Sequence, residues 1–288
     1  MVDASRIQVT PVPRKSEHPY IVPEPQSEFL RGSEHHAEIS STNDRALELC
    51  GDELLPIPYL IATDHQTSGR GRGSNRWWSN DGALMFSVII DAFDYKLPES
   101  RWPQVSLTVG AAVCETLVRT FAEQLRSTDA AAQPRIGLKW PNDVWINGRK
   151  ACGILVEIPP SRSGRLVIGV GLNVNNSFAS APEEMRSIAT SMFDEAERVF
   201  DRSAVLAMFL SQLDSDLRNL AADDGSLPAR WRSHCVLTGR EITLESGTQT
   251  TTGYCLGIAP DGALQLQLGW NVQRFYGGIV RKIETPAQ

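Results

Sequence analysis

The 288-residue sequence lacks a long hydrophobic run and an apolar segment near its N-terminus. The first absence argues against a membrane-spanning helix, which needs about 18–20 consecutive apolar residues. The second argues against a secretory signal peptide, so we expect a cytoplasmic protein with no membrane partner. Hydrophobic residues still make up 41% of the chain, an ordinary share for a globular protein with a buried core.

Positive charge is also scarce. The chain has 28 Lys and Arg residues against 34 Asp and Glu residues, and its net charge is −6. A protein that holds nucleic acid over a wide face is normally basic, so this balance argues against a DNA partner. Residues 1–36 also lack the three amphipathic helices of a helix-turn-helix domain, and we expect no operator binding.

The five cysteines form no CxxC pair, and an odd number cannot all be paired with one another. Their spacing therefore predicts neither a zinc site nor a disulfide framework. We expect reduced, buried thiols, as in most cytoplasmic proteins.

The pattern along the chain predicts three regions. Residues 1–36 hold five prolines with charges between them and read as a poorly ordered tail. Residues 37–234 alternate strands and helices around a sheet, which indicates an α/β (α+β) fold. We expect strands over 59–63, 84–91, 136–140, 144–146, 150–158 and 165–173, and helices over 45–50, 103–125, 203–220 and 228–234. After Cys235, short strands over 236–245, 250–258, 263–268 and 272–276 indicate a small β-barrel.

A loop of alternating glycine and arginine, Gly69 to Gly73, lies between two of these strands. Glycines let a backbone approach a ligand closely, and the guanidinium groups of Arg70 and Arg72 match phosphate geometry. The loop fits neither the P-loop pattern nor the dinucleotide-binding fingerprint, which lies between a strand and a helix. The loop alone is equally compatible with a solvated surface turn.

A second cluster is the run Lys139-Trp-Pro-Asn-Asp143. Pro141 ends a strand because it cannot donate to the ladder, which places Asn142 and Asp143 in a turn. The turn is compatible with a simple Asx turn. In the functional interpretation, Lys139 contacts phosphate and Asp143 supports a magnesium ion.

Two further strands carry glycine beside basic groups. Lys150 begins the strand that returns from the Asn147-Gly148 hairpin turn, and Gly153 lies within it. Gly169 and Gly171 lie within the next strand. Glycine in a strand interior indicates close approach of a ligand or of another backbone segment.

Together these clusters resemble the biotin protein ligase family, in the family's order and at similar spacing. The matching segments are Ser41-Thr-Asn43, Gln66 with Gly69–Arg72 and Trp77, Lys139–Asp143, Arg149-Lys150 with Gly153–Glu157, and Gly169–Asn173. The resemblance runs from about Ile39 to the C-terminus. It implies a mixed-sheet catalytic domain of the biotin/lipoate ligase type over 37–234 and an SH3-like domain over 235–288.

The resemblance also implies a two-step reaction. Biotin and ATP form biotinyl-5′-AMP, and a lysine of a biotin carboxyl carrier domain, from acetyl-CoA carboxylase or a similar enzyme, then accepts the biotinyl group. ATP with Mg²⁺ and biotin would be the small molecules used, with no tightly bound cofactor. We expect ligase activity without DNA binding. The sequence does not decide whether two chains form a homodimer through an edge strand.

By resemblance, the catalytic residues are Lys150, Arg70 and Arg72. The implied biotin-binding residues are Ser41, Thr42, Asn43, Gln66, Gly69, Arg70, Gly71, Arg72, Lys150, Gly153, Leu155, Gly169 and Gly171. The implied ATP- and adenylate-binding residues are Arg70, Arg72, Trp77, Lys139, Asn142, Asp143, Lys150 and Asn173, and Asp143 is also the implied Mg²⁺ ligand. The glycines are expected to leave a slot for the biotin ring and acyl chain, and Arg70→Gly is expected to let adenylate escape.

The sequence departs from the family pattern where many members continue the Gly-Arg run, because Gly73-Ser74 stands there instead. This departure puts one phosphate contact in doubt. The alternatives are a lipoate or octanoate ligase of the same fold and a biotin-responsive regulator. Lys139–Asp143 and the Gly-Arg run favour biotin over lipoate.

Overall fold

The structure is a computed structural model and describes residues 29–284, except 79–80, 126–132, 161–163 and 224. Most of the expected tail, residues 1–28, lies outside these ranges. The elements in chain order are β1 (Gly32–Ile39), α1 (Thr42–Leu49), β2 (Tyr59–Gln66), β3 (Leu84–Asp91), η1 (Glu99–Gln104), α2 (Val105–Leu125), β4 (Ile136–Lys139), β5 (Asp143–Ile146), β6 (Arg149–Glu157), β7 (Arg165–Leu172), α3 (Glu183–Arg186), α4 (Met192–Ala196), α5 (Arg202–Ala222), α6 (Ser226–His234), β8 (Glu241–Ser246), β9 (Gln249–Ile258), β10 (Leu264–Leu268), β11 (Asn271–Phe275) and β12 (Ile279–Ile283).

The larger sheet has seven strands in the order β1-β2-β3-β7-β6-β5-β4. Strand β1 runs parallel to β2, and the other neighbouring pairs are antiparallel. The expected mixed sheet is therefore confirmed. The buried strand expected over 84–91 forms with those bounds, and Pro103 lies just before α2 in a 3₁₀ turn, as its position near a helix start predicts.

The tail was expected to extend to residue 36, but the edge strand β1 already begins at Gly32 and runs to Ile39. Phe29 and Leu30 just before it are buried in the core. The polar sequence of β1 concealed this strand, because its side chains are satisfied by ion pairs rather than by burial. Glu34, for example, accepts a bond from Arg45 Nε of α1 at 2.9 Å.

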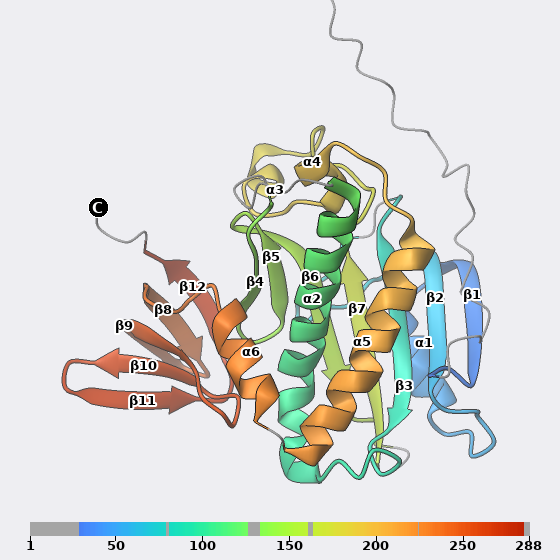
Figure 1. The fold of residues 1–288 in the computed structure, drawn as a ribbon, viewed down its shortest axis with the longest axis horizontal. Coiled ribbons are helices and arrows are strands. Elements are labelled where there is room, and N and C mark those ends of the chain that lie inside the picture. The colour runs from blue at the N-terminus through green and yellow to red at the C-terminus, as the bar shows by residue number, and fades with distance from the viewer. Residues whose placement is uncertain (1–28, 79–80, 126–132, 161–163, 224, 285–288) are drawn as a thin grey trace, which may run out of the picture.

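Helices α2 and α5 cover one face of this sheet, the face turned toward the viewer in Figure 1. The helical stretch Glu99–Gln124 is apolar and long enough to cross a membrane, but 72% of its most apolar window is buried inside the structure. Its apolar character is therefore explained by the core, where it packs between the sheet, α5 and α6.

The opposite face carries the short helix α1, which contacts β2, β3 and β7. Ala46 and Cys50, from α1 and its C-terminal cap, pack on Ile61, Ile89 and Val167 of three adjacent strands. Because α1 has only eight residues, it covers one part of this face. The rest of the face, beyond the N-terminus of α1, is left for the site described below.

The C-terminal region forms a separate five-stranded antiparallel sheet in the order β11-β10-β9-β8-β12 (Figure 1). Four of its strands match the expected segments, whereas β12 was missed because only Val280 among its five residues is buried. The sheet is tied to the larger body by bonds from Val236 N to Leu138 O, at 3.0 Å, and from Trp140 Nε1 to Gly262 O, at 3.1 Å. A domain boundary near Cys235 stays a prediction.

Candidate functional site

A cleft of about 890 Å³, partly open to solvent, lies on the α1 face of the sheet. Its floor is set by strand register, because Leu155 pairs with Gly169 and Gly153 pairs with Gly171 on β6 and β7. Residues two apart in a strand share a face, so these four positions form one continuous surface.

The N-terminus of α1 forms one end of the cleft. Ser41 is the N-cap of α1, and its hydroxyl accepts from Asp44 N. Thr42 N donates to Gln66 Oε1 at 2.8 Å, which orients the glutamine side chain at the end of β2. The motif residues Ser41, Thr42 and Gln66 are thereby brought together at the cleft wall.

Ser87 on β3 supports this end of the cleft and was missed in the sequence. Its hydroxyl lies 2.8 Å from Thr42 Oγ1 and 2.6 Å from Asn43 Oδ1, and the side chain is fully buried. The available signal was a single hydroxyl within the apolar run Leu84–Asp91. A buried polar group in such a strand requires a partner, and here the partners are two motif residues.

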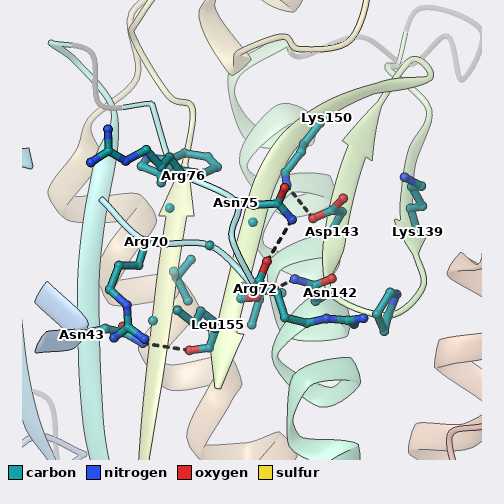
Figure 2. Close-up of a pocket in the computed structure, with 18 of the residues that line it drawn as sticks. Asn43, Arg70, Arg72, Asn75, Arg76, Lys139, Asn142, Asp143, Lys150 and Leu155 are labelled. Atoms are coloured by element: carbon teal, nitrogen blue, oxygen red, sulfur yellow. Dashed lines mark hydrogen bonds and ion pairs between the residues drawn. The ribbon is translucent and has the colours of Figure 1, made fainter. Parts of the chain in front are cut away.

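Asn43 fills the space above Gly169. A Cβ atom at Gly169 would lie 1.9 Å from Asn43 Oδ1, so no other residue fits there. Asn43 Nδ2 donates to Glu157 Oε2 at 2.8 Å and faces Leu155 O at 3.3 Å, as Figure 2 shows for the latter contact. In this structure Asn43 occupies the space directly above Gly169, and the slot for ligand at this glycine stays a prediction.

Trp77 fills the space above the other two floor glycines. A Cβ atom would lie 2.5 Å from the Trp77 ring at Gly171 and 3.1 Å from it at Gly153. The buried indole N–H of Trp77 has no hydrogen-bond partner within the described part of the chain. Unpaired buried donors are uncommon, so this N–H is a candidate donor to a ligand group.

Arg70, at the Asn43 end of the cleft, binds carboxylates of the protein. Its NH1 lies 2.6 Å from Asp44 Oδ1, and its NH2 lies 2.7 Å from Glu157 Oε1. The hydrogen bond to Glu157 is the main cause of the raised pKa of Arg70, which burial opposes and the bond to Asp44 reinforces. Arg70 therefore ties α1 to β6 in this structure.

Arg72 reaches the C-terminal sheet instead. Its NH2 donates to Gly278 O at 2.6 Å, and Gly278, Ile279 and Val280 also line the cleft. These C-terminal lining residues were missed, because nothing in their sequence marks them as part of a site. In Figure 2, Arg72 lies between Arg70 and the strand-borne residues of the far wall.

The loop of residues 69–77, called the Gly-Arg loop below, is itself a closed turn. Gly71 N donates to Asn75 O at 2.8 Å, and Trp77 N donates to Gly69 O at 2.9 Å. Gly73 has φ +67°, a left-handed conformation that favours glycine. The Gly73-Ser74 departure therefore places a permissive residue where the turn needs one.

The far wall holds Lys150 and Asp143 on neighbouring strands, pointing toward each other (Figure 2). Lys150 Nζ lies 2.7 Å from Asp143 Oδ1. Lys139, at the end of β4, lies with its ammonium 5.0 Å from the ring centre of Trp145. Burial is the main cause of the lowered pKa of Lys139; the charge of Asp143 opposes the shift and that of Lys150 adds to it.

Two predicted site residues are not among those that line the cleft, and a third has a structural partner. Gly69, the first residue of the Gly-Arg loop, is buried against Trp77 and Gln66. Asn173 is 4% exposed and donates through Nδ2 to Thr190 O at 3.0 Å, so the expected contact with adenylate is not formed by this geometry. Asn142 lines the cleft, but its Nδ2 donates to Ile154 O at 2.8 Å.

The cleft is strongly cationic. Its charged lining among the described residues comprises Arg70, Arg72, Arg76, Lys139, Lys150 and one acid, Asp143. A partly enclosed site with five cations suits a polyanion such as a nucleotide triphosphate, because opposite charges attract more strongly where water is partly excluded. The apolar ring of Trp77 and the glycine floor offer a place for an uncharged ring or chain beside it.

A mixed sheet that holds a cationic cleft beside an apolar glycine floor, next to a small β domain, defines a nucleotide-dependent acyl ligase. Residues 36–173 match the Biotin/lipoate A/B protein ligase family, and residues 237–282 match the biotin protein ligase C-terminal domain. The chain belongs to this family, within its biotin protein ligases.

Three relatives illustrate this membership. The chain is 32% identical to the biotin–[acetyl-CoA-carboxylase] ligase of Mycobacterium tuberculosis over 81% of this chain and 82% of that one. It is 31% identical to the bifunctional ligase/repressor BirA of Bacillus subtilis over 85% of this chain and 72% of that one. A structure of the Aquifex aeolicus biotin protein ligase in complex with biotin and ATP matches 87% of this chain and 97% of its own, with a TM-score of 0.71 and 25% identity.

Proposed function

We propose that this protein joins biotin to ATP and then transfers the biotinyl group to a lysine of a biotin carboxyl carrier domain. In the first step, a biotin carboxylate oxygen bonds to the α-phosphorus, and pyrophosphate leaves to give biotinyl-5′-AMP. In the second, the lysine amine attacks the acyl carbon and AMP leaves. The main support is the cationic wall of Lys150 and Lys139 beside a floor that suits an apolar ligand.

The first step brings two anions together, so it needs fixed positive charge at the reacting atoms. Lys150 lies on the strand wall and faces the cleft, where it suits the reacting carboxylate and the α-phosphate. Lys139 and Arg72 flank it and suit the remaining phosphate oxygens. ATP would compete with Asp143 for Lys150 and with Gly278 O for Arg72, because each cation already has a partner.

The other end of the cleft suits the biotin ring system. Its ureido group needs both donors and acceptors, which the side chains of Ser41, Thr42 and Gln66 provide. Asn43 serves this end by holding the Leu155 carbonyl and the Glu157 carboxylate in place. Biotin binding would require Trp77 to leave the floor at Gly153 and Gly171, and the ring would then cover the ligand and exclude water.

A magnesium ion fits the site only together with the nucleotide. The described residues contain no group of three or more His, Cys, Asp or Glu side chains placed to hold a metal. Asp143 is a single carboxylate beside the phosphate-binding cations, which suits an ion that arrives on ATP and keeps several phosphate and water ligands. Such an ion would neutralise phosphate charge during the first step.

The acceptor is proposed as the carrier domain of acetyl-CoA carboxylase or a similar biotin enzyme, supported by the activity named for the Mycobacterium tuberculosis relative. We propose a cytoplasmic location for the reaction. Operator binding is not proposed, because the net charge is −6. Strand β1 is an edge of the seven-stranded sheet, and pairing of two chains through it is tested by the molar mass of the protein in solution.

Exchange of labelled pyrophosphate into ATP tests the first step alone. The purified protein should catalyse this exchange when biotin and Mg²⁺ are present and lose it when biotin is left out. Octanoate and lipoate should not replace biotin. Exchange that depends on lipoate and ignores biotin would contradict the proposal and assign the protein to the lipoate branch of the family.

A further inference from the structure

The backbone of Lys150 is held by a segment far along the chain. Lys150 N donates to Ile188 O at 2.8 Å, and Thr190 N donates to Lys150 O at 2.9 Å. The pairing of β6 with β5 passes from Cys152 to Lys150 and skips Ala151, so Lys150 lies at a β-bulge. A bulge re-aims a side chain, and residues 188–190 fix this one from the side away from β5.

Thr190 is the centre of this contact. It is fully buried, its carbonyl accepts from Asn173 Nδ2 at 3.0 Å, and its hydroxyl donates to Glu195 Oε1 at 2.6 Å. Asn173 in turn accepts at Oδ1 from Asn176 Nδ2 at 3.1 Å. The motif residue Asn173, which does not reach the cleft, therefore acts on the segment that holds Lys150.

Glu195 joins both sides of the bulge. Besides Thr190, its Oε1 accepts from Arg149 NH2 at 2.8 Å, and its Oε2 accepts from Asn147 Nδ2 at 2.6 Å. Its side chain is only 7% exposed. One carboxylate thus fixes the hairpin turn before Lys150 and the segment that bonds to Lys150 from the other side.

We propose that Glu195, acting through Thr190 and Arg149, is a positioning residue that aims Lys150 at the reacting phosphate. The role rests on the proposed first step. Removing the carboxylate would leave the buried Thr190 hydroxyl without its acceptor, which is costly enough to shift it, and would free the Arg149 NH2 group. The bulge at Lys150 would then relax, which moves Nζ without removing it.

Kinetics of pyrophosphate exchange test this role with a matched pair of variants. Glu195→Gln removes the negative charge but keeps one acceptor oxygen. Glu195→Ala removes both the charge and the acceptors. Asp214→Asn is the control, because Asp214 also binds two partners, Tyr95 and Arg218, but lies on α5 across the sheet from the cleft. We expect Glu195→Ala to lower kcat by roughly 10–100-fold through misplacement of Lys150, with the KM for biotin little changed and Glu195→Gln between Glu195→Ala and wild type.

Thr190 variants keep the test open if Glu195→Ala does not fold. Thr190→Val keeps the shape and the backbone but loses the hydroxyl, and we expect it to lower kcat as Glu195→Ala does. Thr190→Ser keeps the hydroxyl and should restore most of the wild-type kcat. Equal kcat for the valine and serine variants would overturn the proposal.

Hydrogen exchange of the ligand-free protein separates this inference from the proposed function, because it needs no substrate. The amides of Lys150 and Thr190 should exchange faster in Glu195→Ala than in wild type or Asp214→Asn. Unchanged protection of both amides, or a kcat loss shared by Asp214→Asn, would refute the positioning role. If wild-type protein does not exchange pyrophosphate in a biotin-dependent way, the proposed function is wrong. The amide hydrogen exchange would still show whether Glu195 holds the backbone of Lys150.

Discussion

The two walls of the cleft are built differently. On the strand wall, Lys150 and Asp143 lie on paired strands, and the backbone of Lys150 pairs with β5 on one side and bonds to residues 188 and 190 on the other. On the loop wall, Arg70 and Arg72 extend from the Gly-Arg loop to other elements, namely to two carboxylates and to Gly278 O. One wall presents Lys150 from a strand backbone that is held on both sides, and the other presents its arginines from a loop whose side chains reach other elements.

This difference suggests a division of labour. The proposed chemistry at the α-phosphate requires a precisely positioned charge, and Lys150 on strand β6 would supply it. Retention of a reactive intermediate requires a part that opens and closes, and the Gly-Arg loop has the exchangeable contacts for it. Because Arg72 binds Gly278 O, the C-terminal sheet is part of that closure.

The largest effect is expected at the strand wall. Lys150→Ala removes the cation that we propose acts at the reacting carboxylate, and it should lower the rate of biotin-dependent pyrophosphate exchange by about 10³-fold, as for the loss of other preorganised charge-stabilising groups. Its circular dichroism spectrum and melting temperature should stay close to wild type, because Lys150 is partly exposed. A folded Lys150→Ala protein with normal exchange would remove Lys150 from its assigned role.

Substitutions in the loop wall should impair retention of biotinyl-5′-AMP in the cleft rather than its formation. Arg72→Gly frees the Gly-Arg loop from the C-terminal sheet, so biotinyl-5′-AMP should escape and label bystander lysines roughly 10–100-fold more, the value of one charge-assisted bond. Arg70→Gly, the matched control, loosens α1 from β6 and should leak less.

The measurement for this pair is biotin incorporated into albumin in the presence of each variant. This order revises the expectation from sequence, which placed the leak at Arg70. Greater leakage from Arg70→Gly than from Arg72→Gly would return the retention role to Arg70.

The smallest expected effect is on the free energy of unfolding, which the partly buried Lys139 of the strand wall lowers. Burial lowers the pKa of Lys139, so the unfolded chain binds more protons than the folded protein, and the penalty is full below the folded pKa. Lys139→Met should therefore stabilise the ligand-free protein at neutral pH by roughly 1 kcal/mol, as other relieved functional sites do. The advantage should shrink as the pH rises toward the ordinary lysine value of about 10.4.

Thermal melts of both proteins from pH 7 to pH 10 measure this difference. A difference in melting temperature between Lys139→Met and wild type that grows with pH would contradict burial of the Lys139 charge as the cause. Affinity for ATP should fall in the same variant, because Lys139 lines the cleft.

Elements with a strong local pattern could be predicted from the sequence. The apolar run Leu84–Asp91, the hairpin turn at Asn147-Gly148 and the helix after Pro103 formed as expected. Strands β1 and β12 could not be predicted, because edge strands need only one neighbour and can carry polar side chains along their length. Their partners, β2 and β8, lie elsewhere in the chain.

The sequence predicts many of the residues that form the cleft but not how their side chains are arranged in it. The segments Ser41–Asn43, Lys139–Asp143 and Lys150–Leu155 do meet in one cleft. Nothing in the spacing indicates that Trp77 occupies the floor, or that Glu195 supports Lys150 through Thr190. Such contacts depend on the packing of distant segments, which local pattern does not contain.

The most direct measurement is the mass of a carrier domain after incubation with this protein, ATP, Mg²⁺ and biotin. A single biotinyl addition at one lysine is expected, dependent on ATP, and it should be absent when the protein carries Lys150→Ala. A carrier domain left unmodified by folded wild-type protein, or modified only when lipoate replaces biotin, would contradict the account.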